Sequence, residues 1–348
     1  MSFRVAVVGA GRMGKLHARV IHEMSGATLA CVVDANAAAA QALAKQRDTV
    51  AVTDPAQAVE MCDAAIIAVP TRAHLDAARP FLKAGKSVLI EKPLAPDIAT
   101  GREIIELARQ GGASVQVGHT ERFNPAVLAL SKHAFAPKFI EADRISPFTF
   151  RSADVGVVLD MMIHDIDLVL MLAASRVVDV HAVGVAVIGK HEDICNARLA
   201  FANGCVANIT ASRLAVKTER RMRIFGEQAY LSVDYAKKTG VVIKKSENLD
   251  LIQMARELDV KDLAELATSV DYTKLLKYEQ LIVDDSTEPL CRQAEAFRRT
   301  VEEGAAPVVS AADGLAAIEV AYQILDAIAA HRWDGDRSDR QGPDVLVK

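Results

Sequence analysis

A largely apolar stretch, residues 157–173, carries titratable side chains at regular spacing. Asp160, His164 and Asp167 follow one another at i, i+4 and i+7, which places them on one stripe of a buried helix. Burying such groups is costly unless they are paired or face a wet cavity. In that setting Asp160 can orient an imidazole, and His164 can take a proton near neutral pH. Asp165 lies off the stripe and is interpreted as a solvent-exposed or structural group. The stripe predicts catalytic chemistry.

Two other interpretations of this stripe stay open. One is a structural His–Asp pair whose hydrogen bonds are made within the protein, and which takes no part in a reaction. A zinc site is disfavoured, because two carboxylates and one histidine would all come from one helix with no further ligand in view. The sequence therefore predicts no metal.

Lys92 is a second candidate for chemistry, because it directly follows the apolar strand pattern at 87–91. Pro93 restricts the backbone of Lys92 to extended conformations and fixes the direction in which the chain leaves the strand. A lysine held there can donate to a substrate hydroxyl and stabilise a developing alkoxide, or act as a base if burial lowers its pKa. The non-catalytic alternative is a surface lysine paired with Glu91. A Glu-Lys-Pro motif taken alone would favour this alternative.

A glycine turn supplies the third candidate site. Gly9, Gly11 and Gly14 form a G-x-G-x-x-G pattern between an apolar strand and an amphipathic helix, where they allow a tight turn, close approach of a pyrophosphate and close helix packing. A second apolar strand ends in Asp34, twenty residues beyond Gly14, where an acid can accept the ribose hydroxyls of NAD and repel the 2′-phosphate of NADP. The pattern predicts NAD as cofactor.

These residues need elements that bring them together. Residues 1–118 alternate between strand and helix patterns, which predicts a parallel sheet covered on both faces. The expected strands are 3–8, 28–34, 49–52, 64–69, 87–91 and 114–118, and the expected helices are 13–24, 36–46, 55–61, 72–84 and 96–111. Right-handed crossovers place the carboxyl ends of the strands at one edge, where ligands bind. The candidate cofactor-binding residues at this edge are Gly9, Gly11, Arg12, Met13, Gly14, Asp34, Pro70, Thr71, His74, Glu91 and Lys92.

After Pro125 the pattern changes. The helix at 157–173 is followed by β-rich segments at 177–189, 195–215 and 220–245, which predict an antiparallel sheet. Residues 250–280 have the pattern of short helices. Helices at 289–303 and from the capping box Ser310–Asp313 onward close the fold. We expect a dinucleotide-binding Rossmann domain at 1–122, a substrate-binding and oligomerisation domain at 123–332, and a frayed polar tail at 333–348.

Composition narrows the class of protein. The 348 residues are about half apolar and carry a net charge of −4, which gives no reason to expect nucleic acid or an anionic membrane as partner. Five scattered cysteines without C-x-x-C spacing argue against disulfides and suit a reducing cytoplasm. No segment has the pattern of a signal peptide or a membrane span. We therefore expect a cytoplasmic protein.

In order and type, these motifs resemble those of the glucose–fructose oxidoreductase/inositol dehydrogenase (Gfo/Idh/MocA) family. The resemblance rests on the glycine turn, Asp34, Glu91-Lys92-Pro93 and Asp160-x-x-x-His164-x-x-Asp167, and covers about residues 3–330. It implies a Rossmann domain followed by a domain with a large, mostly antiparallel open sheet, and homodimers or homotetramers formed through the sheets. It also implies Lys92 and His164 as the catalytic pair, with Asp160 as helper.

A narrower resemblance concerns the stretch Gly118-His119-Thr120-Glu121-Arg122-Phe123-Asn124-Pro125, which is similar to the UDP-N-acetylglucosamine 3-dehydrogenases within that family. Those enzymes oxidise a sugar C3 hydroxyl to a ketone that a downstream aminotransferase aminates. The candidate substrate-binding residues are His119, Glu121, Arg122, Phe123, Asn124, Asp167 and Arg213.

Other functions remain open. The substrate can be a free polyol such as inositol or a small carbonyl compound, or the protein can be a non-catalytic NAD-binding sugar sensor. A nucleotide sugar needs cations for its diphosphate. The sequence offers Arg122, Arg213, Lys217, Arg221 and Arg223 for this purpose, although solvated surface charge is their ordinary role.

Overall fold

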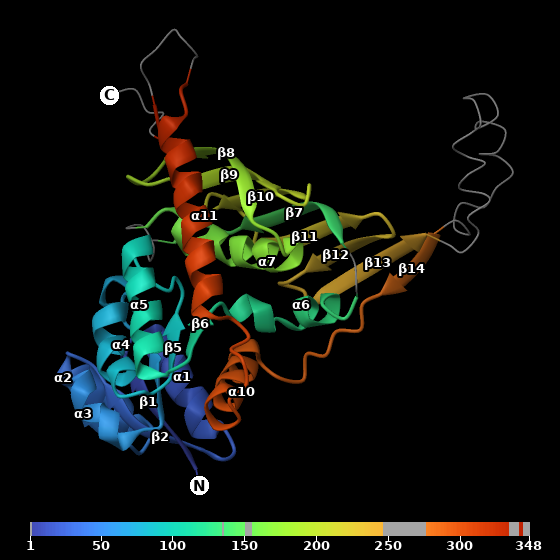
Figure 1. Cartoon of the computed structure of the whole chain (residues 1–348). Helices are drawn as coiled ribbons and strands as arrows, with labels where there is room; N and C mark the ends of the chain where they lie inside the picture. The colour runs from blue at the N-terminus through green and yellow to red at the C-terminus, as the bar shows by residue number, and fades with distance from the viewer. Residues whose placement is uncertain (1, 134–135, 150–154, 246–275, 334–340, 344–348) are drawn as a thin grey trace, which may run out of the picture.

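The computed structural model describes residues 2–133, 136–149, 155–245, 276–333 and 341–343. Two sheets organise these residues, and the long helix α11(Ala311–Ala330) runs beside both (Figure 1). Within the described ranges, no helix has the length and apolarity needed to cross a bilayer.

The first sheet has six parallel strands in the order β3-β2-β1-β4-β5-β6. Its strands are β1(Phe3–Val8), β2(Ala27–Val33), β3(Val50–Val52), β4(Ala64–Ile67), β5(Val88–Glu91) and β6(Val115–Gly118). The connecting helices are α1(Arg12–Glu23), α2(Ala37–Gln46), α3(Pro55–Ala58), η1(Val59–Met61), η2(Thr71–Ala73), α4(His74–Lys83) and α5(Ile98–Gly111). The predicted doubly wound sheet is confirmed. Its strands read as continuous apolar runs because helices cover both faces.

The second sheet has eight strands in the order β14-β13-β12-β11-β7-β10-β9-β8, antiparallel except for the β7–β10 pair. They are β7(Pro137–Ile145), β8(Val177–Val185), β9(Ile194–Phe201), β10(Val206–Ser212), β11(Glu219–Gly226), β12(Ala229–Asp234), β13(Thr239–Lys245) and β14(Leu276–Gln280). The chain enters this sheet through η3(Thr120–Phe123) and α6(Pro125–Leu130). The predicted antiparallel sheet is confirmed, but α6 and the central strand β7 were not expected.

The expected helix at 157–173 consists of two different segments. A π-helical turn, η5(Val158–Met162), precedes the α-helix α7(Ile163–Ala173). A π turn holds more residues than an α turn, so it rotates the side chains before it relative to those after it. The expectation of a single α-helix over 157–173 is therefore wrong for its first turn.

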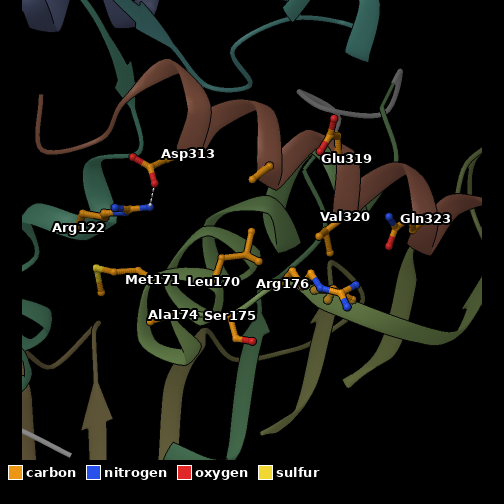
Figure 2. A pocket seen from close by; sticks show the side chains of 12 residues that line it. Arg122, Leu170, Met171, Ala174, Ser175, Arg176, Asp313, Glu319, Val320 and Gln323 are labelled. Atoms are coloured by element: carbon orange, nitrogen blue, oxygen red, sulfur yellow. Dashed lines mark ion pairs between the residues drawn. The ribbon is translucent and has the colours of Figure 1, made fainter. Parts of the chain in front are cut away.

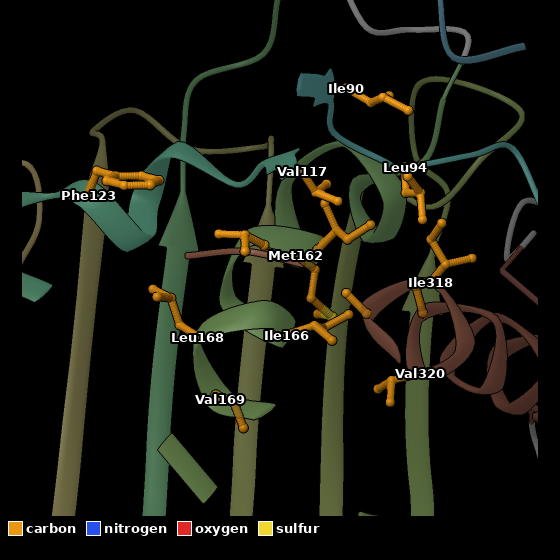
Figure 3. Close-up of a cluster of buried hydrophobic side chains, with 14 of the residues drawn as sticks. Ile90, Leu94, Val117, Phe123, Met162, Ile166, Leu168, Val169, Ile318 and Val320 are labelled. Atoms are coloured by element: carbon orange, nitrogen blue, oxygen red, sulfur yellow. The ribbon is translucent and has the colours of Figure 1, made fainter. Parts of the chain in front are cut away.

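One apolar core joins the two domains. Ile90, Leu94 and Val117 of the first domain belong to the same buried cluster as Met162 and Ile166, with Ile318 of α11 beside them (Figure 3). The predicted capping box starts α11: Ser310 Oγ accepts from Asp313 N at 3.2 Å, and Asp313 Oδ2 accepts from Ser310 N at 2.8 Å. A shared core fixes the strand ends of one domain against the helix of the other.

The other closing helix, α10(Pro289–Glu302), packs on the first domain. Its Phe297 ring lies 6.3 Å from that of Phe3 between centroids, and Arg19 of α1 donates to Glu288 at 2.7 Å. Both rings are fully or almost fully buried. Residues far apart in the sequence thus complete the apolar layer beside β1.

Two sequence predictions about the later part of the chain need correction. Residues 276–280 form β14 and not a short helix, while 250–275 lie outside the described residues. The tail is not frayed at 341–343, because Pro343 O accepts from Ala186 N at 2.7 Å and Gly342 O accepts from the Trp333 indole at 2.8 Å. Residues 334–340 and 344–348 lie outside the description.

Candidate active site

A cavity of about 600 Å³ lies where the carboxyl edge of the first sheet meets the second domain. The first domain contributes Arg12, Met13, Ala68, Val69, Glu91, Lys92, Gly118 and Thr120. The second contributes Arg144, Ser146, Pro147, Thr149, Asp160, Met161, His164, Arg213 and Arg220. The cavity therefore brings together the glycine turn, Lys92 and His164, as the sequence predicted.

The glycine turn fits a dinucleotide. Gly9 has φ +110°, and a Cβ on Gly14 would lie 1.7 Å from Gly9 O, so both positions require glycine. A Cβ on Gly11 would meet nothing within 4 Å, which leaves open space above the start of α1. No side chain caps the N-terminus of α1, so its first N–H groups are available to a pyrophosphate.

Asp34 lies directly after β2, against this turn. Its Oδ2 accepts from Ala10 N at 2.7 Å and its Oδ1 accepts from Asn36 N at 2.8 Å. The carboxylate is partly exposed. These two hydrogen bonds fix a negative charge beside the glycine turn, where an adenosine ribose would lie.

The neighbouring strand end contains the predicted residues Pro70 and Thr71, directly after the cavity-lining Val69. His74, which the sequence predicted to bind cofactor, does not line the cavity. Its ring is 1% exposed, and its nitrogens contact the carbonyl oxygens of Val69 and Leu94 at 3.0 and 3.3 Å. Through these contacts His74 connects the segments that follow β4 and β5.

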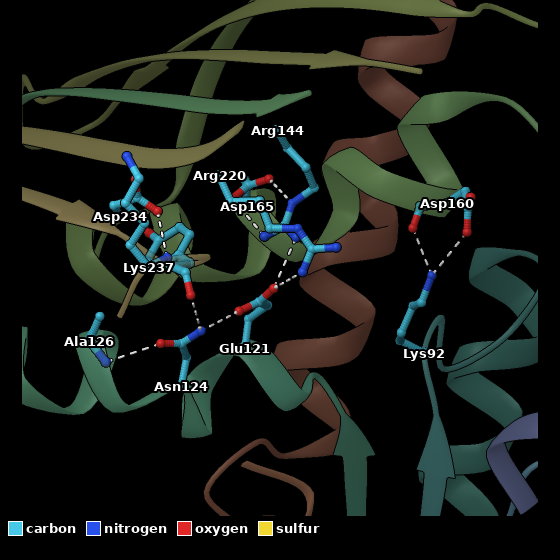
Figure 4. A network of polar contacts seen from close by, with 11 residues as sticks. Lys92, Glu121, Asn124, Ala126, Arg144, Asp160, Asp165, Arg220, Asp234 and Lys237 are labelled. Atoms are coloured by element: carbon cyan, nitrogen blue, oxygen red, sulfur yellow. Dashed lines mark hydrogen bonds and ion pairs between the residues drawn. The ribbon is translucent and has the colours of Figure 1, made fainter. Parts of the chain in front are cut away.

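Lys92 crosses from the first domain to the second. Its Nζ donates to Asp160 O at 2.7 Å and to Asp160 Oδ1 at 3.3 Å (Figure 4). The Lys92–Pro93 peptide is cis. The side chain of Glu91 pairs with His17 instead, at 2.7 Å between Glu91 Oε1 and His17 Nε2. The alternative of a surface Lys92–Glu91 pair is therefore wrong.

His164 begins α7 and reaches the same cavity. Its Nδ1 is buried and has no hydrogen-bond partner among the described residues, whereas Nε2 is not buried. Burial, reinforced by the charges of Lys92 and Arg144, holds the pKa of His164 well below its usual value. The imidazole is therefore neutral at neutral pH, and its open nitrogen can accept a proton. Asp160 does not orient it as predicted, because its carboxylate contacts Lys92.

Arg122 and Asp167, which the sequence predicted to bind substrate, do not line this cavity. They form a buried ion pair, with Arg122 Nη2 and Asp167 Oδ1 2.7 Å apart. Arg122 also lies 3.6 Å from Asp313, at the edge of a second cavity of about 330 Å³ between α7 and α11 (Figure 2). The pair ties η3 to α7 and is structural.

Other members of the 118–125 stretch also have supporting positions. Glu121 accepts from Arg144 at 2.9 Å and from Asn124 at 3.1 Å, and Asn124 caps α6 by accepting from Ala126 N at 3.0 Å. Phe123 is buried in the shared core, and His119 is fully buried against His164. None of these four side chains, which the sequence predicted to bind substrate, lines this cavity.

Two cavity-lining arginines were missed by the sequence analysis. Arg144 donates to Asp165 Oδ2 at 2.5 Å and to Glu121, and these carboxylates raise its pKa although burial alone would lower it (Figure 4). Asp165 is therefore structural and not solvent-exposed. Arg144 was missed because its strand was not recognised.

The other missed residue, Arg220, precedes Met222 by two positions on β11 and so shares its inward face. The period-two pattern of that strand could have identified it. The predicted cations Arg221 and Arg223 lie on the opposite face and pair with Asp143 and Glu141. Arg213, by contrast, lines the cavity as predicted and pairs with Asp193 at 2.6 Å.

A dinucleotide-binding turn, an amine and a neutral imidazole that share one cavity define a nicotinamide-dependent oxidoreductase. Residues 3–119 match the model of the "oxidoreductase family, NAD-binding Rossmann fold", and residues 133–232 match the "GFO/IDH/MocA C-terminal domain". The chain belongs to the Gfo/Idh/MocA family of oxidoreductases, which act on CH–OH groups.

Individual relatives are similar to the chain to different extents. UDP-N-acetylglucosamine 3-dehydrogenase of Acidithiobacillus ferrooxidans is 38% identical over 68% of this chain and 75% of that protein. A solved structure of that enzyme superposes with a TM-score of 0.82 at 30% identity, covering 94% of this chain and 98% of that one. Inositol 2-dehydrogenase of Rhizobium meliloti is 27% identical over 95% and 98% of the two chains. Levoglucosan dehydrogenase in complex with NADH shares the fold, with a TM-score of 0.79 at 18% identity over 94% and 97%.

Proposed function

We propose that this chain uses NAD to oxidise the C3 hydroxyl of a UDP-linked N-acetylhexosamine to a ketone. The 38% identical relative is named for that reaction. The observation that carries the proposal in this chain is the balance of charge in the cavity, because a nucleotide sugar differs from a free sugar by its diphosphate.

Most cations of the cavity already have an anionic partner. Lys92 pairs with Asp160, Arg213 with Asp193, and Arg144 with two carboxylates. Arg220 is different: its guanidinium lies 3.5 Å from Glu121, whose carboxylate Arg144 already binds at 2.9 Å, and its side chain is 46% exposed. A diphosphate offers this guanidinium a better partner.

Arg12 is the other cation of the cavity that can bind a further anion. It is exposed at the start of α1, and it has no ion pair within the part of the chain that the structure describes. The cofactor pyrophosphate suits Arg12 because both belong at the glycine turn. Arg220, on the second domain, is then left for an anion on the substrate. A free polyol has no such anion.

The chemistry divides between two side chains. Lys92 donates a hydrogen bond to the reacting oxygen, and the neutral imidazole of His164 accepts its proton. Asp160 holds Nζ of Lys92 in place from the opposite domain. The cofactor, when bound, supplies a nicotinamide ring that accepts the hydride.

Oxidation of a free polyol is the second candidate function. It is favoured by the inositol 2-dehydrogenase relative, which aligns with nearly the whole chain. The proposed roles of Lys92 and His164 suit any secondary alcohol, so these residues do not distinguish the two substrates. Arg220 does, because only the nucleotide sugar needs it.

A trapped assay tests the proposal. Oxidation of a secondary alcohol by NAD is uphill near neutral pH, so a ketone trap or an aminotransferase must remove the product. Reduced-nicotinamide absorbance is then compared for UDP-N-acetylglucosamine, free N-acetylglucosamine and myo-inositol, with Lys92→Met as the inactive control. We expect turnover of the UDP-sugar alone. Efficient turnover of inositol, with none of the trapped UDP-sugar, would favour the second candidate.

A further inference from the structure

His119 lies directly after β6, and its ring packs against that of His164. Its side chain is 0% exposed, and neither of its ring nitrogens has a hydrogen-bond partner among the described residues. The ring packs edge-to-face on that of His164, with centroids 6.2 Å apart and planes at 88°. Polar atoms buried this deeply ordinarily have a partner, so this ring needs one.

The surrounding elements hold the two imidazoles opposite each other. His119 precedes Arg122 by three residues, and His164 precedes Asp167 by three residues. The Arg122–Asp167 ion pair therefore forms one cross-connection between η3 and α7, and the imidazole pair forms the next. Because the ion pair is bidentate and buried, it fixes the position of His119 relative to His164.

His164 also lacks a partner for one ring nitrogen among the described residues. A histidine that accepts a proton at one nitrogen must carry its hydrogen on the other, and a neighbouring acceptor normally selects that tautomer. The buried nitrogen of His164 is Nδ1, and Asp160 is engaged with Lys92. The ring of His119, which packs against His164, has two buried nitrogens without a partner among the described residues. One water with hydrogen bonds of about 2.8 Å on each side spans the separation between two such rings.

We infer that His119 is a positioning residue for His164, and that the two rings share one buried water. Nδ1–H of His164 donates to this water, which donates in turn to His119. Nε2 of His164 is thereby kept as the proton acceptor in the cavity. In the reaction the substrate O–H bond breaks and an Nε2–H bond forms, while the hydride leaves carbon for the nicotinamide. The inference rests on the role proposed for His164.

The charges around the two rings agree with this arrangement. The charges of Lys92 directly after β5, Arg144 on β7 and Arg220 on β11 all oppose protonation of His164. His119 is close to the charges of both Arg122 and Asp167, which oppose each other, and burial lowers its pKa. Both rings are therefore neutral at rest, so one can donate while the other accepts.

Three variants test the inference. His119→Phe keeps a ring of similar shape without nitrogens, and His119→Asn keeps a group that can hold a water. Tyr235→Phe is the matched control, since it removes a different buried polar group, a hydroxyl that has no partner among the described residues. The readouts are kcat, KM, the Kd for NADH, and the His164 tautomer in substrate-free enzyme by ¹⁵N NMR.

We expect His119→Phe to lower kcat about 10- to 100-fold, with KM and the NADH Kd unchanged. The ¹⁵N shifts should show His164 moving away from the Nδ1–H tautomer, and His119→Asn should restore both properties. Unchanged kcat and tautomer in His119→Phe would overturn the inference, and so would equal losses in both variants without a change of tautomer. Because the tautomer is read without substrate, a wrong substrate assignment leaves this result interpretable.

Discussion

At the scale of single residues, Lys92 and His164 differ in how the protein holds them. Lys92 has two oxygen partners on Asp160, so its ammonium is fixed in direction. His164 has no partner for Nδ1 among the described residues and is kept neutral by burial and by neighbouring cations. One side chain is therefore suited to donate a hydrogen bond and the other to accept a proton.

Replacing either residue should affect the chemical step. We expect Lys92→Met and His164→Ala each to lower kcat about 100- to 10,000-fold, because each removes a donor or a base from the reacting oxygen. Single-turnover kinetics would measure the effect, and NADH fluorescence titration should show unchanged cofactor binding. Near-normal turnover in both variants would place the active site elsewhere.

Arg220 should act on substrate binding. For Arg220→Gln we expect KM for a UDP-sugar to rise about 10- to 100-fold, the loss typical of a charge-assisted hydrogen bond. Arg221→Gln is the matched control, because the neighbouring side chain faces the other side of β11. Steady-state kinetics on both variants checks this, and equal effects would contradict an anion site at Arg220.

Asp34 should decide between the two nicotinamide cofactors. Its carboxylate is fixed beside the glycine turn, where it repels a 2′-phosphate. We expect NAD to bind more tightly than NADP, and Asp34→Ala to narrow the ratio of the two Kd values by on the order of tenfold. Calorimetric titration of both cofactors measures this ratio. Tighter binding of NADP by the unmodified protein would show that the interpretation of Asp34 is wrong.

The sequence predicted which side chains reach the edge of the first sheet better than it predicted the contacts of their neighbours. Gly9–Gly14 and Lys92 follow strands, so parallel-sheet geometry alone brings them to one edge. The positions of Arg122 and Glu121 depend on which partner each side chain meets across the domain interface. Spacing along the chain does not determine that partner, and both proved to be committed to buried ion pairs.

At the scale of elements, local sequence pattern again predicts what does not depend on tertiary contacts. Strands of the first sheet are continuous apolar runs, which local pattern identifies well. The strand β7 has Glu141, Asp143 and Arg144 among its apolar residues, so its pattern was hidden. The π turn at 158–162 likewise has no marker in the sequence, because its residues are compatible with an α-helix. Tertiary packing decides both.

The ion pairs of Arg144 connect η3, β7 and α7, so they should contribute strongly to stability. We expect Asp165→Ala to lower the free energy of unfolding by about 3–5 kcal/mol, because it leaves a buried guanidinium without one of its partners. Urea denaturation measures the change. Asp143→Ala breaks an outer ion pair of the same strand and should cost less than about 1 kcal/mol. Similar losses in the two variants would contradict this ranking.

At the scale of the whole molecule, buried histidines link stability to pH. Burial lowers the pKa values of His74, His119 and His164 in the folded state. An unfolded chain binds protons at these residues first, so their contribution is complete above about pH 6.5 and is lost as the pH falls below it.

Thermal unfolding from about pH 7.5 down to about pH 5 should therefore show a falling midpoint. The slope should be shallower in His119→Phe, because that residue no longer titrates in either state. His181→Asn is the control, because it replaces a histidine that is exposed. An identical slope in all three proteins would contradict the linkage to His119.

The return of α10 to the first domain has a consequence for how the protein is made. Arg19 and Glu288 are 269 residues apart in the sequence, and Phe3 lies still farther along the chain from Phe297. A ribosome therefore releases the whole nucleotide-binding half, and most of the second sheet, before the helix that covers β1 and α1 is synthesised. During that interval the nascent chain exposes apolar surface that residues 289–302 later cover. The apolar layer beside β1 is therefore complete only after α10 has been synthesised, although the rest of the first domain is encoded before residue 119.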